Sequence, residues 1–361
     1  MDTAAATGLT VQQWDDQFFE DSLNANQFFS YMGTDENSLI QLKEKLMKEP
    51  GDSVTFALVN SLKNSATTGS NTLEGNEEDL VSRSQVLTID QYRHAVRIPV
   101  LQNQFSAIDL RKAAKTALLN WEMELVRDQI IAALASINGV AYGTATEGQK
   151  DTWITDNNDR VLFGAATSNY SAGDHSASLA NIDNTADQLT PDAISLMKRM
   201  AKAASPKIGP LKPRTQKSRS DAYVLFAGSL NLRNLKQDST FVQANREARE
   251  RGKGNPLFDD ADYIWDNVAI IEIEDIAVTG SVGAASIQVA PVYLCGVQAI
   301  GMAVAKRPES IEEDFDYKDK QGLAIRQWHE IDKLRFGTGT SDTADLKQHG
   351  MVTGYFAALA D

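Results

Sequence analysis

Residues 106–139, SAIDLRKAAKTALLNWEMELVRDQIIAALASING, carry the strongest helical pattern in the chain. Apolar residues recur there every three or four positions, which places them on one face of a helix. They are Leu110, Ala114, Ala117, Leu118, Trp121, Leu125, Ile131 and Leu134. Ser106 is a suitable N-cap and Gly139 a suitable stop. We predict a helix over 106–138, roughly 48 Å long at about 1.5 Å per residue, which is typical of a plate-like domain built along a spine.

Two strand-like segments precede this helix and flank a polar stretch. Residues 53–59 (SVTFALV) and 85–100 (QVLTIDQYRHAVRIPV) alternate and are rich in β-branched and aromatic residues. We predict an extended β-hairpin over 51–104, on the order of 50 Å or more in length at about 3.3 Å per residue. A two-stranded ribbon is marginally stable alone in water. The hairpin must therefore rest on the rest of the chain or on a neighbouring subunit.

The remaining segments predict a mixed fold without repeats. Residues 1–50 form an arm with exposed aromatics that should lie on another surface, and 140–189 are loop-like in composition. A helix is expected after the Thr190 cap and Pro191, and strands at 222–228, at 261–276 and at the C-terminus. There is no regular βαβ alternation, so the predicted class is α+β.

Composition excludes several classes of protein. The chain has 361 residues, 42% of them hydrophobic and 23% charged, which is ordinary for a globular protein. No run approaches the roughly 18 apolar residues of a membrane span, and the acidic N-terminus does not resemble a signal peptide. The formal net charge of -14 disfavours a global grip on nucleic acid. The single cysteine, Cys295, has apolar neighbours and is predicted to be a buried small hydrophobe.

Motifs for catalysis are lacking. The stretch around Gly252 and Gly254 has neither the third glycine nor the preceding strand of a dinucleotide site, and His329-Glu330 lacks the second histidine of a zinc helix. The acids of 312–319 are interpreted as a solvated or salt-bridged face, and those of 156–160 as a polar turn. We therefore predict no catalytic residue, no cofactor and no metal site.

The acidic stretch 71–80, NTLEGNEEDL, allows three interpretations. Its acids, Glu74, Glu77, Glu78 and Asp79, offer oxygens for a metal ion, a solvated turn, or a contact surface. Four carboxylates without a histidine repel one another within one chain. At the distal part of a hairpin they stay solvated or meet basic residues of a neighbour.

Several of these segments together resemble a known family. They are 51–100, which contains LEGNEE and the IDQYRHAVR segment, the helix ending ALLNWEMELVRDQIIAALASING, ADYIWDNVAIIEIED, GVQAIGMAVAK, EEDFDYKDKQGLAI and HGMVTGYFAAL. In content and order they are similar to the major capsid proteins of tailed bacteriophages, of the podovirus type. The resemblance covers the chain from about residue 50 to its end, and it is weakest over 140–220.

The resemblance implies the Hong Kong 97-type capsid fold. The expected parts are an N-terminal arm (1–50), an extended loop (51–104), a peripheral domain with the spine helix (105–187), an axial domain (188–300) and a return to the peripheral domain (301–361).

The function that the resemblance implies is structural. Such proteins assemble through hexamers and pentamers into an icosahedral shell around double-stranded DNA, which they do not bind sequence-specifically. The expected partners are further copies of the chain, scaffold, portal and decoration proteins, and no membrane. The expected location is the virion, and the host cytoplasm during assembly.

Charge suggests which residues touch across subunits. The acids of 71–80 are expected to meet Arg93 and Arg97 of another subunit's hairpin, or the basic loop 207–219 with Lys212 and Arg214. Two alternatives remain open. One is another virion protein, such as a tail tube or decoration protein, and the other is a hydrolase that uses a divalent ion at 312–319.

Overall fold

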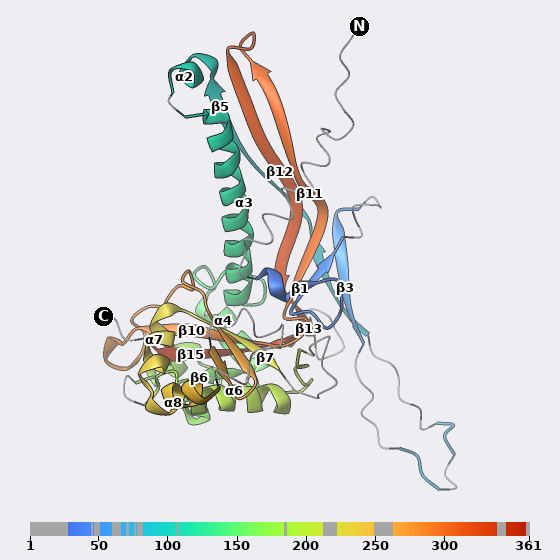
Figure 1. The fold of residues 1–361 in the computed structure, drawn as a ribbon. Coiled ribbons are helices and arrows are strands. Elements are labelled where there is room, and N and C mark those ends of the chain that lie inside the picture. Colours follow the sequence, from blue (N-terminus) through green and yellow to red (C-terminus); the bar gives the residue numbers. More distant parts are fainter. Residues whose placement is uncertain are drawn as a thin grey trace.

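The computed structural model contains an elongated lobe and a compact lobe, which Figure 1 shows joined at one end of the long helix. The structure describes residues 28–44, 46, 51–59, 66–69, 72–75, 77, 82–106, 108–183, 186–211, 222–248, 263–337 and 344–358. Within those ranges, no helix is both long and apolar enough to cross a membrane. Both lobes combine helices with strands, which confirms the predicted α+β class.

A five-stranded sheet runs along the elongated lobe (Figure 1). In spatial order its strands are β1 (Met32–Gly33), β2 (Ile40–Lys43), β11 (Ile300–Phe315), β12 (Lys320–Lys333) and β5 (Asp90–Pro99). The strands β11 and β12 form a long antiparallel hairpin, and β5 pairs with β12 as an edge strand. Segments from both halves of the sequence therefore build one sheet.

The helix α3 (Leu110–Ala135) lies along this sheet and confirms the predicted spine helix, although it is shorter than 106–138. The predicted cap was wrong, because Asp109 rather than Ser106 accepts hydrogen bonds from two backbone N–H groups of the first turn. A carboxylate also interacts favourably with the positive end of the helix dipole. The residues just before it form a separate short helix, α2 (Val100–Phe105).

The buried face of α3 differs from the predicted stripe. Its buried residues are Ala114, Leu118, Glu122, Val126, Ile130, Ala133 and Leu134. Ala117 is exposed, and Leu125 and Ile131 are only partly buried. Most of the buried positions are four residues apart, a row that is inclined to the helix axis. The contact face therefore turns gradually along the helix, as it passes from the long sheet to the compact lobe.

A second sheet, of six strands, forms the centre of the compact lobe. In spatial order its strands are β6 (Val161–Phe163), β15 (Met351–Ala357), β10 (Val289–Cys295), β7 (Tyr223–Ala227), β9 (Val268–Glu272) and β8 (Tyr263–Trp265). The strands predicted at 222–228 and 261–276 and at the C-terminus are confirmed. The smaller elements are β13 (Arg335–Gly337), β14 (Leu346–Gln348), and the 3-10 helices η1 (Phe29–Tyr31), η3 (Thr167–Asn169) and η4 (Ala284–Ser286).

Both faces of the six-stranded sheet are covered, which explains its continuous apolar strands. In β7, Tyr223 and Leu225 face a core formed with α6 (Pro191–Ala203), α7 (Ser229–Gln237) and α8 (Ser239–Ala248). The alternate residues, Val224 and Phe226, face a core that includes α3. The helix α6 begins as predicted, with the Thr190 cap and Pro191 in its first turn.

One hydrophobic core joins the two lobes. Its members come from the C-terminal half of α3, from β7, β9 and β10 of the compact lobe, and from β11 of the long sheet. They include Val126, Ile130, Leu134, Phe226, Ile271, Tyr293, Cys295, Ile300 and Met302. Cys295 is fully buried there, as predicted, and burial raises the pKa of its thiol.

The C-terminal part of the chain is divided between the sheets. The resemblance implied that residues 301–361 return to the peripheral domain. In the structure, β11 and β12 lie in the long sheet, and β15 pairs with β10 and β6 in the compact lobe. Strand pairing between distant segments is decided by non-local contacts, which the local pattern of residues does not contain.

The segment 140–183 is more regular than its loop-like composition suggested. It contains α4 (Glu147–Asp156), β6 and α5 (His175–Ala180), which surround the fully buried Trp153. The helix α4 begins with a capping box in which the side chains of Thr146 and Gln149 each accept from the other's backbone N–H. This signal was present in the sequence and was missed.

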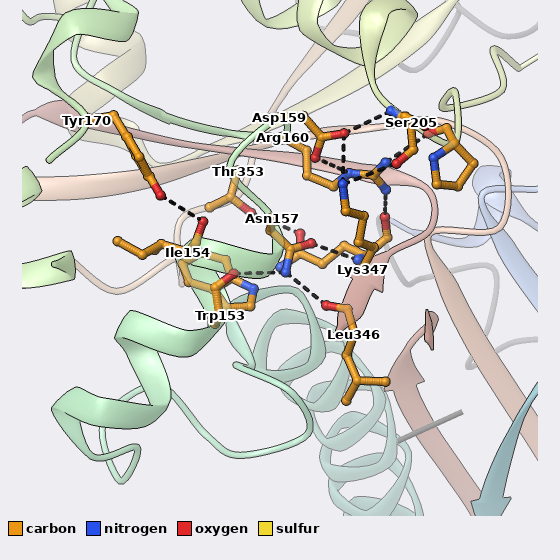
Figure 2. A network of polar contacts seen from close by, with 12 residues as sticks. Trp153, Ile154, Asn157, Asp159, Arg160, Tyr170, Ser205, Leu346, Lys347 and Thr353 are labelled. Carbon is orange, nitrogen blue, oxygen red and sulfur yellow. Dashed lines mark hydrogen bonds and ion pairs between the residues drawn. The ribbon is translucent and has the colours of Figure 1, made fainter. Parts of the chain in front are cut away.

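The polar turn predicted at 156–160 is present, but two of its side chains do not face solvent. Asn157 and Arg160 are fully buried. Figure 2 shows that they connect the end of α4 to β14 and to the loop at Ser205. Asn157 Nδ2 donates to the carbonyls of Trp153 and Leu346, both at 3.0 Å.

Arg160 is the centre of the same polar network. Its Nε donates to Asp159 at 3.2 Å, and its terminal nitrogens donate to the carbonyls of Gln348 and of Pro206, the latter at 2.8 Å. Asp159 also accepts from the backbone N–H of Ser205 and pairs with Lys347. The guanidinium lies beside Asp159 and helps to lower the pKa of that carboxyl against the opposing effect of burial.

The described part of the predicted N-terminal arm packs within its own chain. Phe28, Leu39 and Ile40 are fully buried and Tyr31 nearly so. The strand β2 pairs in parallel with β11. Residues 1–27 lie outside the described residues.

The predicted hairpin over 51–104 is only partly a hairpin. The strands β3 (Ser53–Val59) and β4 (Ser82–Thr88) pair antiparallel along their seven residues. Residues 90–99, expected to continue the second limb, instead form β5 and pair with β12. The chain between β3 and β4 is described only at 66–69, 72–75 and 77. The connection from β3 to β4 is called the finger below.

Candidate assembly interface

The base of the finger is fixed to the body of the protein. Val54, Phe56 and Leu87 of β3 and β4 pack against Ala303 of β11, against Leu334 and against Phe336 of β13. Gln85 is buried, and its Nε2 donates to the carbonyl of Lys333 at 3.1 Å. Its Oε1 accepts from the backbone N–H of Arg335 at 2.8 Å. Packing and hydrogen bonds therefore fix β3 and β4, which flank the finger, against the body.

The two predicted contact acids that the structure describes are solvent-exposed. Glu74 and Glu77 lie in the finger, whose described part points away from both sheets (Figure 1). Gly75, with φ +87°, donates its backbone N–H to Glu77 Oε2 at 2.6 Å, which forms a local turn. Leu73 beside them is 64% exposed. Glu78 and Asp79 lie outside the described residues.

The two predicted contact arginines lie on the open face of the long sheet. Val96 and Ile98 of β5 pack toward α3, so the alternate residues Arg93 and Arg97 face the opposite side. Both are exposed. The guanidinium carbon of Arg97 lies 4.4 Å from the centroid of the Phe315 ring, a cation–π contact that orients it.

Arg93 faces a second arginine across the sheet. It is directly opposite Arg326 of β12 in the antiparallel register. Glu309 accepts from Arg326 at 2.9 Å and pairs with Lys306 at 2.5 Å, and these hydrogen bonds lower the pKa of Glu309. Among the described residues, Arg93 itself has no ion pair. Because like charges directly opposite destabilise a sheet, this position favours an incoming carboxylate.

Aromatic surface adjoins these arginines. Trp328 of β12 lies on the same face, opposite Gln91, and is 38% exposed. The Nζ of Lys306 lies 5.5 Å from its ring centroid. The open face of the sheet is therefore basic and aromatic, a composition that suits contact with an acidic segment carrying an apolar residue.

An apolar group at the far end of the elongated lobe was missed from the sequence. Its exposed residues are Val100, Leu101, Phe105, Ile108 and Tyr317. They come from α2, from the short connection between α2 and α3, and from the turn between β11 and β12. The backbone N–H of Val100 donates to the carbonyl of Asp319 at 2.9 Å and holds the two elements together. The sequence analysis assigned residues 100–104 to the hairpin, whereas they form α2, so this surface was not anticipated.

The other sequence candidates are placed as follows. The acids at 312–319 are salt-bridged, as predicted, with Glu312 bound to Arg111 at 2.5 Å and Asp316 to Lys320 at 2.9 Å. His329 is buried, stacks on Tyr92 and contacts Gln129. Lys212 and Arg214 of the basic loop lie outside the described residues.

Comparison with known proteins gives the family. A family model described as phage capsid protein matches residues 2–360. The major capsid protein of Pseudomonas phage KPP25 is 26% identical over 386 residues, which cover 97% of this chain and 96% of that protein.

Solved structures give the fold. The cyanophage Pam1 capsid asymmetric unit has a TM-score of 0.81 and 30% identity over 100% of both chains. The capsid of Ralstonia phage GP4 has a TM-score of 0.73 and 24% identity over 92% of this chain and 91% of that one. The predicted capsid fold of the Hong Kong 97 type and the predicted role as a phage major capsid protein are thereby confirmed. Since the family model matches nearly the whole chain and the fold is shared along its full length, this chain belongs to the phage capsid protein family.

Proposed function

We propose that the chain assembles through hexamers and pentamers into the icosahedral head shell that encloses the double-stranded DNA of a tailed phage. The likeness to the Pam1 capsid along the full length of both chains carries the proposal. The role is structural, with no catalysis and no cofactor. The five-stranded sheet and α3 would form the peripheral domain, and the compact lobe most of the axial domain.

The partners follow from assembly and charge. The shell would form in the host cytoplasm with scaffold, portal and decoration proteins. A chain of net charge -14 offers the packaged DNA a weakly repulsive wall, so DNA would slide during packaging without sequence-specific contacts.

The proposal is tested by purifying the full chain and imaging it by negative-stain electron microscopy. Closed shells or rings of five or six subunits are expected, with or without a co-expressed scaffold. Tubes would instead support a tail tube protein, and small particles at every concentration would contradict self-assembly.

We further propose that Glu74 and Glu77 of the finger meet Arg93 and Arg97 of a neighbouring copy. The finger acids are exposed, and the described part of the finger points away from its own sheets. Arg93 lacks an ion pair among the described residues and stands opposite Arg326. An intermolecular carboxylate would relieve that repulsion, and such contacts set register and partner choice.

Charge reversal tests this contact. Glu74→Lys with Glu77→Lys should raise the protein concentration needed for shell assembly by roughly tenfold or more, because each like-charge contact costs at least about 1.4 kcal/mol. Circular dichroism of the unassembled protein should be unchanged. Assembly is followed by light scattering.

The reciprocal change provides the control. Adding Arg93→Glu and Arg97→Glu to the finger variant should restore part of the assembly, which a merely unfolded finger would not. Glu274→Lys, on an exposed position of the compact lobe, is the matched single-charge control. Equal assembly by the finger variant and the parent protein would return 71–80 to the class of solvated turns.

A further inference from the structure

Three carboxylates converge where α4 and α5 begin. One oxygen from each of Glu147, Asp151 and Asp174 lies within 4.8 Å of the other two. Glu147 and Asp151 are one turn apart on α4 and share a face. Asp174 is the N-cap of α5 and accepts from the backbone N–H of Ala177 at 2.8 Å. Two different helices therefore direct carboxylates to one point.

A buried imidazole faces the same point. The side chain of His175 is 1% exposed, and its Nδ1 lies 3.9 Å from Glu147 Oε1. The other ring nitrogen, Nε2, has no hydrogen-bond partner among the described residues. The 3.9 Å between Nδ1 and Glu147 is too long for a direct hydrogen bond and leaves room for a shared ligand. The backbone N–H of His175 also donates to Asp151 Oδ1 at 2.8 Å, which fixes the imidazole beside the acids.

The nearby lysine is engaged elsewhere. Lys150 of α4 has its Nζ 4.5 Å from the centroid of the Tyr142 ring. No ion pair joins it to the three acids among the described residues. Of the two aspartates, each has one oxygen held by a backbone N–H and a second oxygen that is available to a ligand. The mutual repulsion of the three carboxylates must therefore be offset by solvent or by a bound cation.

We propose that Glu147, Asp151 and Asp174 bind a divalent cation of the size of Ca²⁺, with His175 beside it. Carboxylate oxygens are the preferred ligands of hard divalent cations. Ca²⁺ accepts carboxylate oxygens in a flexible geometry, whereas Mg²⁺ demands a near-ideal octahedron and keeps several of its waters. Three carboxylates supplied by two different helices therefore suit the ion with the less strict geometry.

The cation would fasten α5 to α4. These two helices pack around Trp153 in the segment 140–183, and their ends otherwise meet through the hydrogen bond from His175 to Asp151. Binding to the folded state alone raises the thermal stability in proportion to the logarithm of the cation concentration. This inference stands on the described contacts and does not depend on the finger contact proposed above.

Thermal unfolding of the full chain, after removal of metals with a chelator, tests the site. Millimolar Ca²⁺ should raise the Tm by about 2–5 °C, with a midpoint on the order of 10⁻⁴ to 10⁻³ M, and Mg²⁺ should raise it less. Glu147→Gln should abolish the shift. Without cation, the Tm of that variant should equal or exceed that of the parent protein, because one repelling charge is gone.

Two further variants separate the site from general charge effects. Glu124→Gln, at an exposed position of α3, should keep the full Ca²⁺ shift. Asp151→Asn retains an oxygen acceptor for the His175 N–H and should lose the shift. The proposal is overturned when Ca²⁺ has no effect on the parent protein, or when it shifts the parent protein and Glu147→Gln equally.

Discussion

Replacing Arg160 with methionine is expected to lower the free energy of unfolding by about 3–5 kcal/mol. The guanidinium is fully buried and holds Asp159 together with two backbone carbonyls (Figure 2). Methionine fills much of the same volume but donates no hydrogen bond. Asp159, half-buried, then keeps Lys347 as a partner but loses the closer one.

Urea unfolding, followed by circular dichroism, measures this loss. Arg160→Lys retains the charge but lacks the planar fork, so a smaller loss of about 1–3 kcal/mol is expected. This second variant keeps the prediction testable where the methionine variant does not fold. The matched control is Arg111→Met, which breaks the ion pair with Glu312 on the surface of the elongated lobe. Both partners are about half exposed, so that loss should stay below about 1 kcal/mol. Equal losses at the two sites would contradict the role given to the buried network.

Acid is expected to destabilise the protein through His329, which is buried, and His349, which is partly buried. Burial lowers the pKa of His329 and of His349 from 6.5 to about 4. A histidine whose folded-state pKa is lowered stabilises the fold fully above pH 6.5. That contribution is lost as the pH falls from 6.5 toward 4, because the unfolded chain takes up protons that the folded chain does not. At about 1.4 kcal/mol per pKa unit, each histidine accounts for roughly 3 kcal/mol at pH 4.

The measurement is a comparison of variants, because Glu330 acts in the opposite direction. Burial raises the pKa of Glu330 to about 7, so its contribution grows as the pH falls from 7 toward 4.5. His329→Gln together with His349→Gln should reduce the slope of the unfolding free energy against pH between 6.5 and 4 without abolishing it, because burial also lowers the pKa of His175 to about 4. His94→Gln changes an exposed imidazole on β5 and is the control. An unchanged pH profile in the double variant would refute the assignment to these two side chains.

Local sequence patterns were sufficient to predict the helices and strands whose apolar residues recur at one regular spacing. The spine helix, α6 with its Thr190 cap, and the buried strands at 222–228 and at the C-terminus all follow from apolar spacing and capping residues. Their local preferences agree with the final fold, so the sequence alone was informative. The helices of 140–183 were missed because polar residues dominate that segment, and only the capping box at Thr146 marked one of them.

The candidate interface was likewise only partly predictable from the sequence. The acidic finger and the arginines of β5 were found from charge alone, and the structure leaves Glu74, Glu77, Arg93 and Arg97 exposed. The opposition of Arg93 to Arg326 depends on strand register between segments more than 200 residues apart, by the difference of their numbers. The approach of Asp174 to Glu147 and Asp151 depends instead on the packing of α5 against α4, which residue spacing along the chain does not specify.

By itself, the sequence determined the type of the main elements, the order of the motifs that mark the capsid family, and the absence of a recognisable catalytic motif. Only the tertiary structure decided that β5 joins β12 rather than extending the finger, that β15 belongs to the compact lobe, and that Arg160 is buried. The physical reason is that helix formation depends on residues three or four positions apart. Strand partners and the burial of a charge depend instead on contacts between distant segments, whose free energies are set only when the whole chain packs.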